Sequence, residues 1–286
     1  MHWLMIIFAV IFAWALRSLD FPVEDSWQKR WGRSLFLFIF PPILLLMTAF
    51  AVIFMGSDGT MLGLHASWLS YVLCLLFNIL AIAILLKLSY QGYISQREIN
   101  QYSQELVAGK KARILETDFP YSAQIGFWNS QLVVSRGMLN ILDRDSLEAV
   151  IAHEQAHCDR RDTFYFFWLG WLKVFSFWLP NTELLWEELL LLREMRADAL
   201  AARKVDSLLL AESLLEIAKA TIGSNYFKLD DRSFSVGLSC SLPRDRFTER
   251  IDALLSETVA IEDSSYWYLS WAIFAFSPLI TVPFHY

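Results

Sequence analysis

Ile151-Ala152-His153-Glu154-Gln155-Ala156-His157 is the stretch around which the rest of this chain is organised. The residues before it have apolar side chains at helical spacing, and Asp145 followed three residues later by Glu148 is the pattern of a helix N-terminus with a capping box. On such a helix, His153 and His157 lie one turn apart on the same face. Two neutral imidazoles at that spacing can bind one Zn²⁺, each at roughly 2.0–2.1 Å.

The residue after the first histidine adds a candidate catalytic group to the predicted metal site. Glu154 can reach a metal-bound water and act as its general base. The His-Glu-x-x-His pattern alone also arises by chance in long chains, where it marks a polar helix face with incidental histidines. Against that alternative, the whole chain has only five histidines, and two of them fall in this spacing.

A second predicted helix, over residues 183–203, carries the run Arg193-Glu194-Met195-Arg196-Ala197-Asp198. Glu194 and Asp198 are again one turn apart. A third zinc ligand, and a carboxylate that orients a ligand histidine, require this placement. The two helices together predict a single zinc ion per chain.

The composition indicates an integral membrane protein that is mainly α-helical. Hydrophobic residues make up 56% of the 286, aromatic residues 15%, and the mean hydropathy is +0.38, which is high for a soluble domain. The net charge of −6, without a long basic cluster, gives no indication of nucleic-acid binding. Three cysteines form no disulfide framework and fit a reducing compartment.

Three apolar runs, at residues 3–16, 35–55 and 68–88, predict an N-terminal transmembrane region over 1–88, although the first run is short. Lys and Arg occur between the first two runs and after the third, and the middle loop has none. The positive-inside rule therefore places residues 89–262 in the cytoplasm. A final apolar segment, 263–286, is a further candidate transmembrane helix.

Residues 164–180 are also apolar, but a single crossing there conflicts with the zinc site. His157 precedes this segment and Glu194 follows it, and both must reach the same ion. We therefore expect a membrane-associated helical hairpin near 164–192, either re-entrant or lying in the interface. A soluble, aromatic core helix is the alternative.

A small β-sheet is expected before the zinc helix, with strands near 112–117, 123–127 and 131–135, after a polar helix over 90–106. An edge strand beside a zinc site can bind an extended peptide by strand addition. The candidate substrate-binding residues are Ala123, Gln124, Ile125 and Gly126. A purely structural strand is an equally good interpretation.

Four motifs are shared with one class of known enzymes. They are Val134-Ser135-Arg136-Gly137-Met138-Leu139, residues 147–157, Arg160-Arg161-Asp162, and residues 193–198. Through them the chain resembles the membrane gluzincin zinc metallopeptidases, of either the BlaR/MecR antibiotic-sensor type or the HtpX and CAAX-prenyl-protease type. The resemblance implies a zincin-like α+β metalloprotease domain in a bacterial inner or cell membrane. It also implies these roles: zinc ligands His153, His157 and Glu194, general base Glu154, and Asp198 bonded to His153.

The function implied is a zinc-dependent endopeptidase that cuts membrane or membrane-proximal proteins or peptides. Arg250 matches a late arginine of the HtpX-like group, but Ser241-Leu242-Pro243 stands where that group has His-Pro. The alternatives are a signalling protease that cleaves a repressor or itself, and a non-enzymatic membrane scaffold with a vestigial zinc site. The sequence does not indicate the oligomeric state or the oxyanion-stabilising residue.

Overall fold

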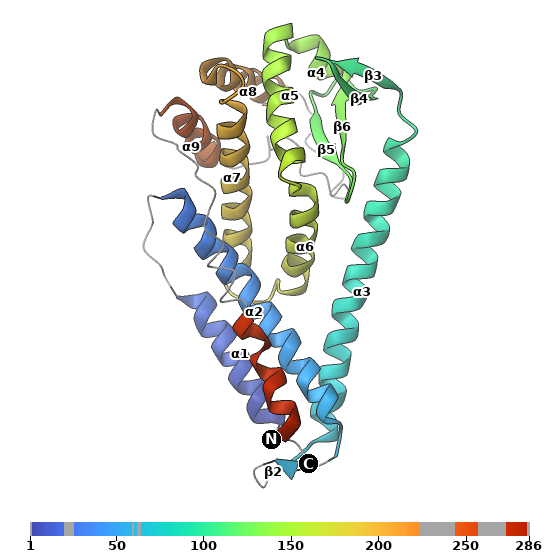
Figure 1. The fold of residues 1–286 in the computed structure, drawn as a ribbon, viewed down its shortest axis with the longest axis vertical. Helices are drawn as coiled ribbons and strands as arrows, with labels where there is room; N and C mark the ends of the chain where they lie inside the picture. The colour runs from blue at the N-terminus through green and yellow to red at the C-terminus, as the bar shows by residue number, and fades with distance from the viewer. Residues whose placement is uncertain are drawn as a thin grey trace. The chain divides into compact units, whose positions relative to one another are not determined.

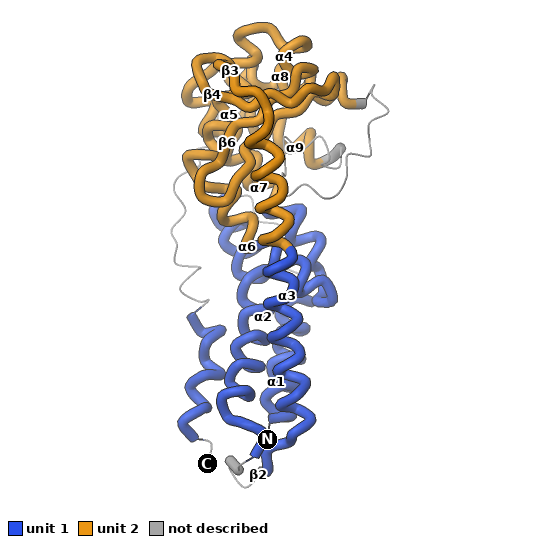
Figure 2. The backbone as a smooth tube through the Cα atoms, turned by 90° about the vertical axis from the view of Figure 1, so that its right-hand side faces the viewer, with its two compact units in different colours: residues 1–87, 169–189, 262–286 blue, residues 88–168, 190–261 orange. Residues whose placement is uncertain are grey.

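The computed structural model describes residues 2–19, 26–58, 60–61, 64–222, 244–256 and 273–284, and most of them are helical. The chain forms two compact units (Figure 2). Unit 1 contains residues 1–87, 169–189 and 262–286, and unit 2 contains residues 88–168 and 190–261. The unit boundaries between described residues fall inside three helices, α3 (Trp68–Ile99), α6 (Asp162–Phe175) and α7 (Thr182–Ala201). The predicted membrane and cytoplasmic assignments of residues 1–88, 89–262 and 263–286 stay predictions.

Unit 1 is built from long apolar helices. Helix α2 (Trp27–Met55) packs against α1 (His2–Ser18) and against a 3₁₀ helix, η1 (Ile273–Phe284). The two-residue strands β1 (Thr60–Met61) and β2 (Leu64–His65) pair between α2 and α3. Within the predicted segment 263–286, η1 is the described part, and the remaining residues lie outside the described ranges.

Two of the described helices, α2 and α3, are long and apolar enough to cross a membrane. Helix α2 has 29 residues and continues through Pro41 and Pro42, and α3 has 32. In the most apolar window of α3 only 17% of residues are buried, so its outward face is apolar. Such a surface is compatible with contact to lipid. Helix α1, with 17 residues, is shorter than the roughly 20 residues that a spanning helix needs.

Unit 2 contains a four-stranded sheet of order β3-β4-β6-β5 (Figure 1). Its strands are β3 (Gln104–Val107), β4 (Lys110–Leu115), β5 (Ser122–Ile125) and β6 (Gln131–Ser135). Strands β4 and β6 are parallel, with Ile114 opposite Val134, and the other pairs are antiparallel. Strand β5 is therefore at an edge, and among the described residues it pairs with β6 alone.

Strand β6 has the predicted bounds, β4 and β5 overlap the predicted ranges with ends that differ by one or two residues, and β3 was not predicted. The expected helix over 90–106 is wrong at its end, because α3 stops at Ile99 and β3 follows. Strands β3 and β4 are joined by a tight turn in which Ala108 (φ 45°) and Gly109 (φ 76°) both have positive φ. Hairpin turns of this kind usually carry Asn-Gly or Asp-Gly, so Ala-Gly gave little signal.

Helix α5 (Arg144–Asp159) lies in the centre of unit 2, between two apolar clusters. Val150 and Ile151 pack with the inward face of the sheet, with α4 (Arg136–Ile141) and with α8 (Ser207–Ile222). Ala149 packs in a second cluster with residues of α7, α8 and α9 (Arg244–Leu255). Because neighbouring turns of α5 are fixed on both sides, the polar residues that follow in the same helix are held in place.

The N-terminus of α5 differs from the capping prediction. Asp143 is the N-cap, and its side chain accepts a hydrogen bond of 2.8 Å from the backbone N–H of Ser146. Asp145 lies in the first turn, and Glu148 pairs with Arg144 at the surface and makes no capping box. Asp143 and Asp145 both have a side chain suited to an N-cap. Only Asp143 has the extended backbone, with φ −70° and ψ 177°, that a cap requires.

Candidate metal centre

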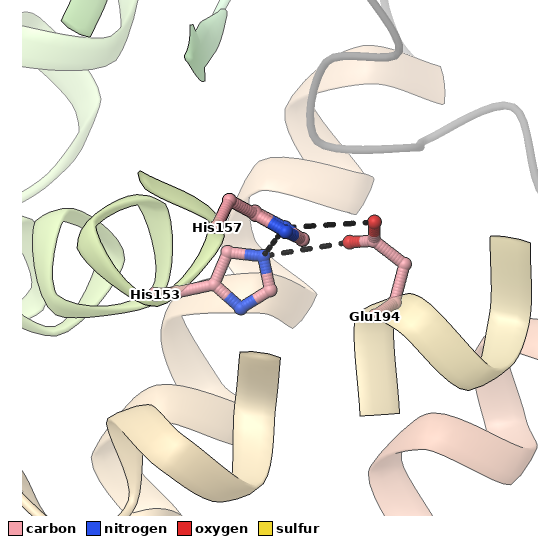
Figure 3. Close-up of side chains that lie close together, drawn as sticks. All are labelled: His153, His157 and Glu194. Carbon is pink, nitrogen blue, oxygen red and sulfur yellow. Dashed lines mark hydrogen bonds and ion pairs between the residues drawn. The ribbon is translucent and has the colours of Figure 1, made fainter. Parts of the chain in front are cut away.

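Helices α5 and α7 bring two histidines and one glutamate together in the interior of unit 2 (Figure 3). The Nε2 atoms of His153 and His157 lie 3.1 Å apart. The Glu194 Oε2 atom lies 3.4 Å from His153 Nε2, and its Oε1 atom lies 3.6 Å from His157 Nε2. His153 and Glu194 are fully buried, and 8% of His157 is exposed.

These distances fit three ligands of one metal ion. Two nitrogen ligands at roughly 2.0–2.1 Å from a tetrahedral zinc stand about 3.3 Å apart, close to the spacings above. Glu194 Oε2 is buried and has no hydrogen-bond partner among the described residues. The Arg250 Nη1 atom lies 3.5 Å from this oxygen and offsets its charge without a hydrogen bond, and a metal ion would add a direct bond to it. The donor set of two imidazoles and one carboxylate is one that zinc uses in catalytic sites.

A carboxylate lies behind each histidine. Asp198 Oδ1 is 2.7 Å from His153 Nδ1, and Asp162 Oδ2 is 2.7 Å from His157 Nδ1. A carboxylate at Nδ1 holds the proton on that nitrogen in a neutral imidazole and leaves the Nε2 lone pair for a metal. Both rings are therefore oriented with Nε2 toward Glu194.

Arginines hold these carboxylates in turn. Arg250 of α9 donates from Nε to Asp198 Oδ2 at 2.8 Å and from Nη2 to Asp198 Oδ1 at 2.9 Å. Arg196 pairs with Asp162, and Arg193 donates from Nε to Glu194 Oε1 at 2.8 Å. The arginine charges offset those of the buried carboxylates.

The charges around the ligands shift their pKa values. Burial alone would lower the pKa of His153, but the Asp198 and Glu194 carboxylates outweigh it and raise that pKa to about 9. Burial would raise the pKa of Glu194, but Arg193 and His157 hold it well below its usual range. The Glu194 carboxylate is thus in the form that binds metal, and a metal ion would displace a proton from His153.

Glu154, the predicted base, is buried on α5 and has one partner that the sequence did not indicate. The Ser122 hydroxyl at the start of β5 donates to Glu154 Oε1 at 2.7 Å. The bond fixes one carboxylate oxygen and joins the edge strand to the helix. Ser122 lies one residue before the predicted strand, where nothing in the local sequence marks a functional hydroxyl.

Asp162 is a second residue whose role the sequence analysis missed, although Arg160-Arg161-Asp162 was noted as a motif. Helix α5 ends at Asp159, Arg160 is its C-cap, and Arg161 adopts a left-handed conformation with φ 54°. This turn starts α6 at Asp162 and returns its carboxylate to His157. An acid five residues after a candidate ligand, across a helix end, is the signal that could have indicated it.

The predicted substrate-binding residues occupy the edge of the sheet. Ala123, Gln124 and Ile125 are in β5, and Gly126 follows it. Ala123 is buried, and Gln124 and Ile125 are partly exposed. Their role in binding peptide stays a prediction.

Residues 96–227 match the model of Peptidase family M48. The matched segment contains every ligand and carboxylate described above, and Arg250 lies beyond it. No solved structure matches the chain. The match supports a metallopeptidase, in agreement with the broad resemblance, and the narrower assignment to a BlaR/MecR or HtpX type stays a prediction.

Proposed function

We propose that this protein is a membrane-embedded zinc endopeptidase that hydrolyses peptide bonds of membrane or membrane-proximal proteins. The observation that carries the proposal is the convergence of His153, His157 and Glu194, inside the segment that matches the peptidase family. Glu154 directly follows the first of these ligands in helix α5. The three ligands would hold one zinc ion per chain. When bound, zinc supplies a Lewis acid that activates water and polarises the carbonyl group of the substrate.

The side chains of the chain itself account for the proton transfers. Glu154 accepts the proton of the attacking water and returns it to the leaving amine. Ser122 holds one Glu154 oxygen, which leaves the other oxygen available to the water. Asp198 and Asp162 keep the two imidazoles in the orientation and tautomer that the reaction needs.

The membrane part of the proposal is supported by helices α2 and α3 and by the distribution of basic residues. Lys29, Arg30 and Arg33 precede the apolar part of α2, and Lys87 and Arg97 follow the apolar part of α3, so both ends face the cytoplasm under the positive-inside rule. An epitope inserted between Ala108 and Gly109 tests the orientation. Antibody should reach it in inside-out vesicles and not in intact cells, and the reverse pattern would refute a cytoplasmic catalytic domain.

The experiment that tests the activity is Glu154→Gln in the full chain, purified in detergent. The variant should keep its zinc, because no ligand changes, and should lose at least about a thousandfold in kcat on an unfolded protein substrate, because the base is gone. Glu148→Gln is the matched control, since it makes the same change on the exposed surface of the same helix.

A Glu154→Gln protein that cuts as fast as wild type would refute the assigned base. Comparison of new protein termini in cells with each form then separates the possible roles. Many cleaved proteins indicate a degradative enzyme, and one or a few indicate a regulatory protease.

A further inference from the structure

Beyond the end of β5, the chain enters a group of aromatic side chains, here called the aromatic cluster. Two members follow the strand and four lie on the first turns of α6, all in unit 2. The Phe127 ring centroid lies 5.0 Å from that of Phe164 and 4.9 Å from that of Phe167. The members are Phe127, Trp128, Phe164, Tyr165, Phe167 and Trp168.

The cluster presents aromatic surface to the outside. Phe127, Phe164 and Phe167 are partly buried and hold the group together, while 72% of Trp128 and 59% of Tyr165 are exposed. Trp128 packs its ring 5.0 Å from Phe164, so the exposed indole is held in position. Large apolar surfaces that are both exposed and fixed commonly mark interaction sites.

Gly126 fixes the direction in which the chain enters the cluster. Its φ is +135°, and a Cβ atom there would lie 2.6 Å from the carbonyl oxygen of Asn129 and 2.7 Å from Gln96 Oε1. No other residue fits this turn without displacing its neighbours. The path from β5 to Phe127 is therefore set by the backbone.

The same strand joins the cluster to the catalytic base. Strand β5 begins at Ser122, which bonds to Glu154, and ends at Ile125, about 10 Å further along. A peptide paired with the edge of β5 opposite β6, with its reacting bond near Glu154, would bring a side chain about three to four residues away against the cluster.

We propose that the aromatic cluster is a substrate subsite that binds a bulky apolar side chain, about three to four residues from the bond that is cut. The inference rests on the proposed peptidase function and deepens it, because it names the substrate class as extended peptides with an aromatic or large aliphatic anchor. A peptide is favoured over a bilayer surface as the occupant because the cluster continues directly from the edge strand that contacts the base.

A peptide series in which one position at a time, on either side of the cut bond, is Trp, Leu, Ser or Asp tests the proposal. Affinity is measured by fluorescence anisotropy on the zinc-loaded Glu154→Gln protein, and cleavage on wild type. Peptides with Trp or Leu at the anchor position should bind about tenfold more tightly than the peptide with Ser there, and their KM should be lower by the same factor. Trp128→Ser with Tyr165→Ser should reduce this preference to about twofold or less.

Leu106→Ser is the control, because Leu106 is 74% exposed on β3, at the opposite edge of the sheet. The proposal is overturned if the anchor preference is absent or if it survives in the double variant. It is also overturned if the only defect of the double variant is that it no longer reconstitutes into phosphatidylcholine vesicles. If the preference appears in binding but wild type cuts none of the peptides, the subsite stands and the peptidase function fails.

Discussion

His153 and His157 are each backed by a carboxylate that an arginine holds, but the two arrangements are assembled differently. Each histidine, together with its carboxylate and arginine, is here called an arm. In the His157 arm the carboxylate is close in sequence, because Asp162 follows the histidine by five residues across one tight turn. The His153 arm is long-range throughout. Asp198 comes from α7, and Arg250 comes from α9, 52 residues further along the chain. Equivalent chemistry at the two rings therefore depends on quite different parts of the fold.

The difference lies in what supports each ring. The His157 arm needs the α5–α6 turn and one long-range contact, that of Arg196 on α7 with Asp162. The His153 arm needs two long-range contacts, because its residues lie on α5, α7 and α9. The His153 arm is also more deeply buried, since 0% of the His153 side chain is exposed, against 10% for His157. Damage to the long-range arm should therefore affect folding and metal binding together.

The largest effect is expected where the two arms meet. Glu194→Ala removes the ligand that both histidines share, so zinc bound after dialysis should fall from about one ion per chain to almost none. Elemental analysis of the purified protein measures this. Glu183→Ala, an exposed change on the same helix, should keep its zinc. Full zinc content in the Glu194→Ala protein would mean that the arms do not meet at one ion.

The comparison of the arms is tested directly by Asp198→Asn and Asp162→Asn. Each should weaken zinc binding about 10- to 100-fold, because the amide no longer holds the proton on Nδ1. Asp198→Asn should be the more severe, since it also removes the charged group that accepts two hydrogen bonds from the buried Arg250 and so lowers the melting temperature. Chelator competition and thermal unfolding measure the two effects, and the reverse ranking would contradict the proposed dependence on α9.

The Ser122→Ala variant tests whether the base, Glu154, needs a hydrogen-bonding partner as the histidine ligands need their carboxylates. Loss of a buried hydrogen bond to a carboxylate is expected to lower kcat by about tenfold and leave zinc affinity unchanged. Ser122→Thr keeps the hydroxyl and should restore most of the rate. A Ser122→Ala protein with wild-type kcat would show that Glu154 is positioned by its helix alone.

The smallest effect is expected at the start of α5. Asp143→Ala should reduce the free energy of unfolding by about 1 kcal/mol through loss of the cap, and Asp145→Ala by no more than a few tenths. Denaturant unfolding of both variants measures the difference. Neither should alter zinc affinity, and a change in affinity would mean that the end of the helix, together with the carboxylates, orients the histidines.

The local parts of this molecule could be predicted from sequence, and the parts that depend on packing could not. The spacing of His153 and His157 on a helix, and of Glu194 and Asp198 on another, follows from helical periodicity. Ser122 could not be identified as the partner of Glu154, because the two are 32 residues apart and the sheet register brings them together. Strand β3 and the N-cap at Asp143 were missed because the local sequence signals for them are weak. The backbone conformation of the folded chain determines both.

Arg250 has a consequence for the order in which the protein can mature. During synthesis the two histidines, Glu194 and Asp198 all emerge from the ribosome before the arginine that holds Asp198. A nascent chain that stops short of α9 has a complete set of metal-binding side chains but leaves Asp198 without this support. Full metal affinity, and with it any peptide-cutting capacity, should therefore arise late, after most of the polypeptide has been made and has left the tunnel.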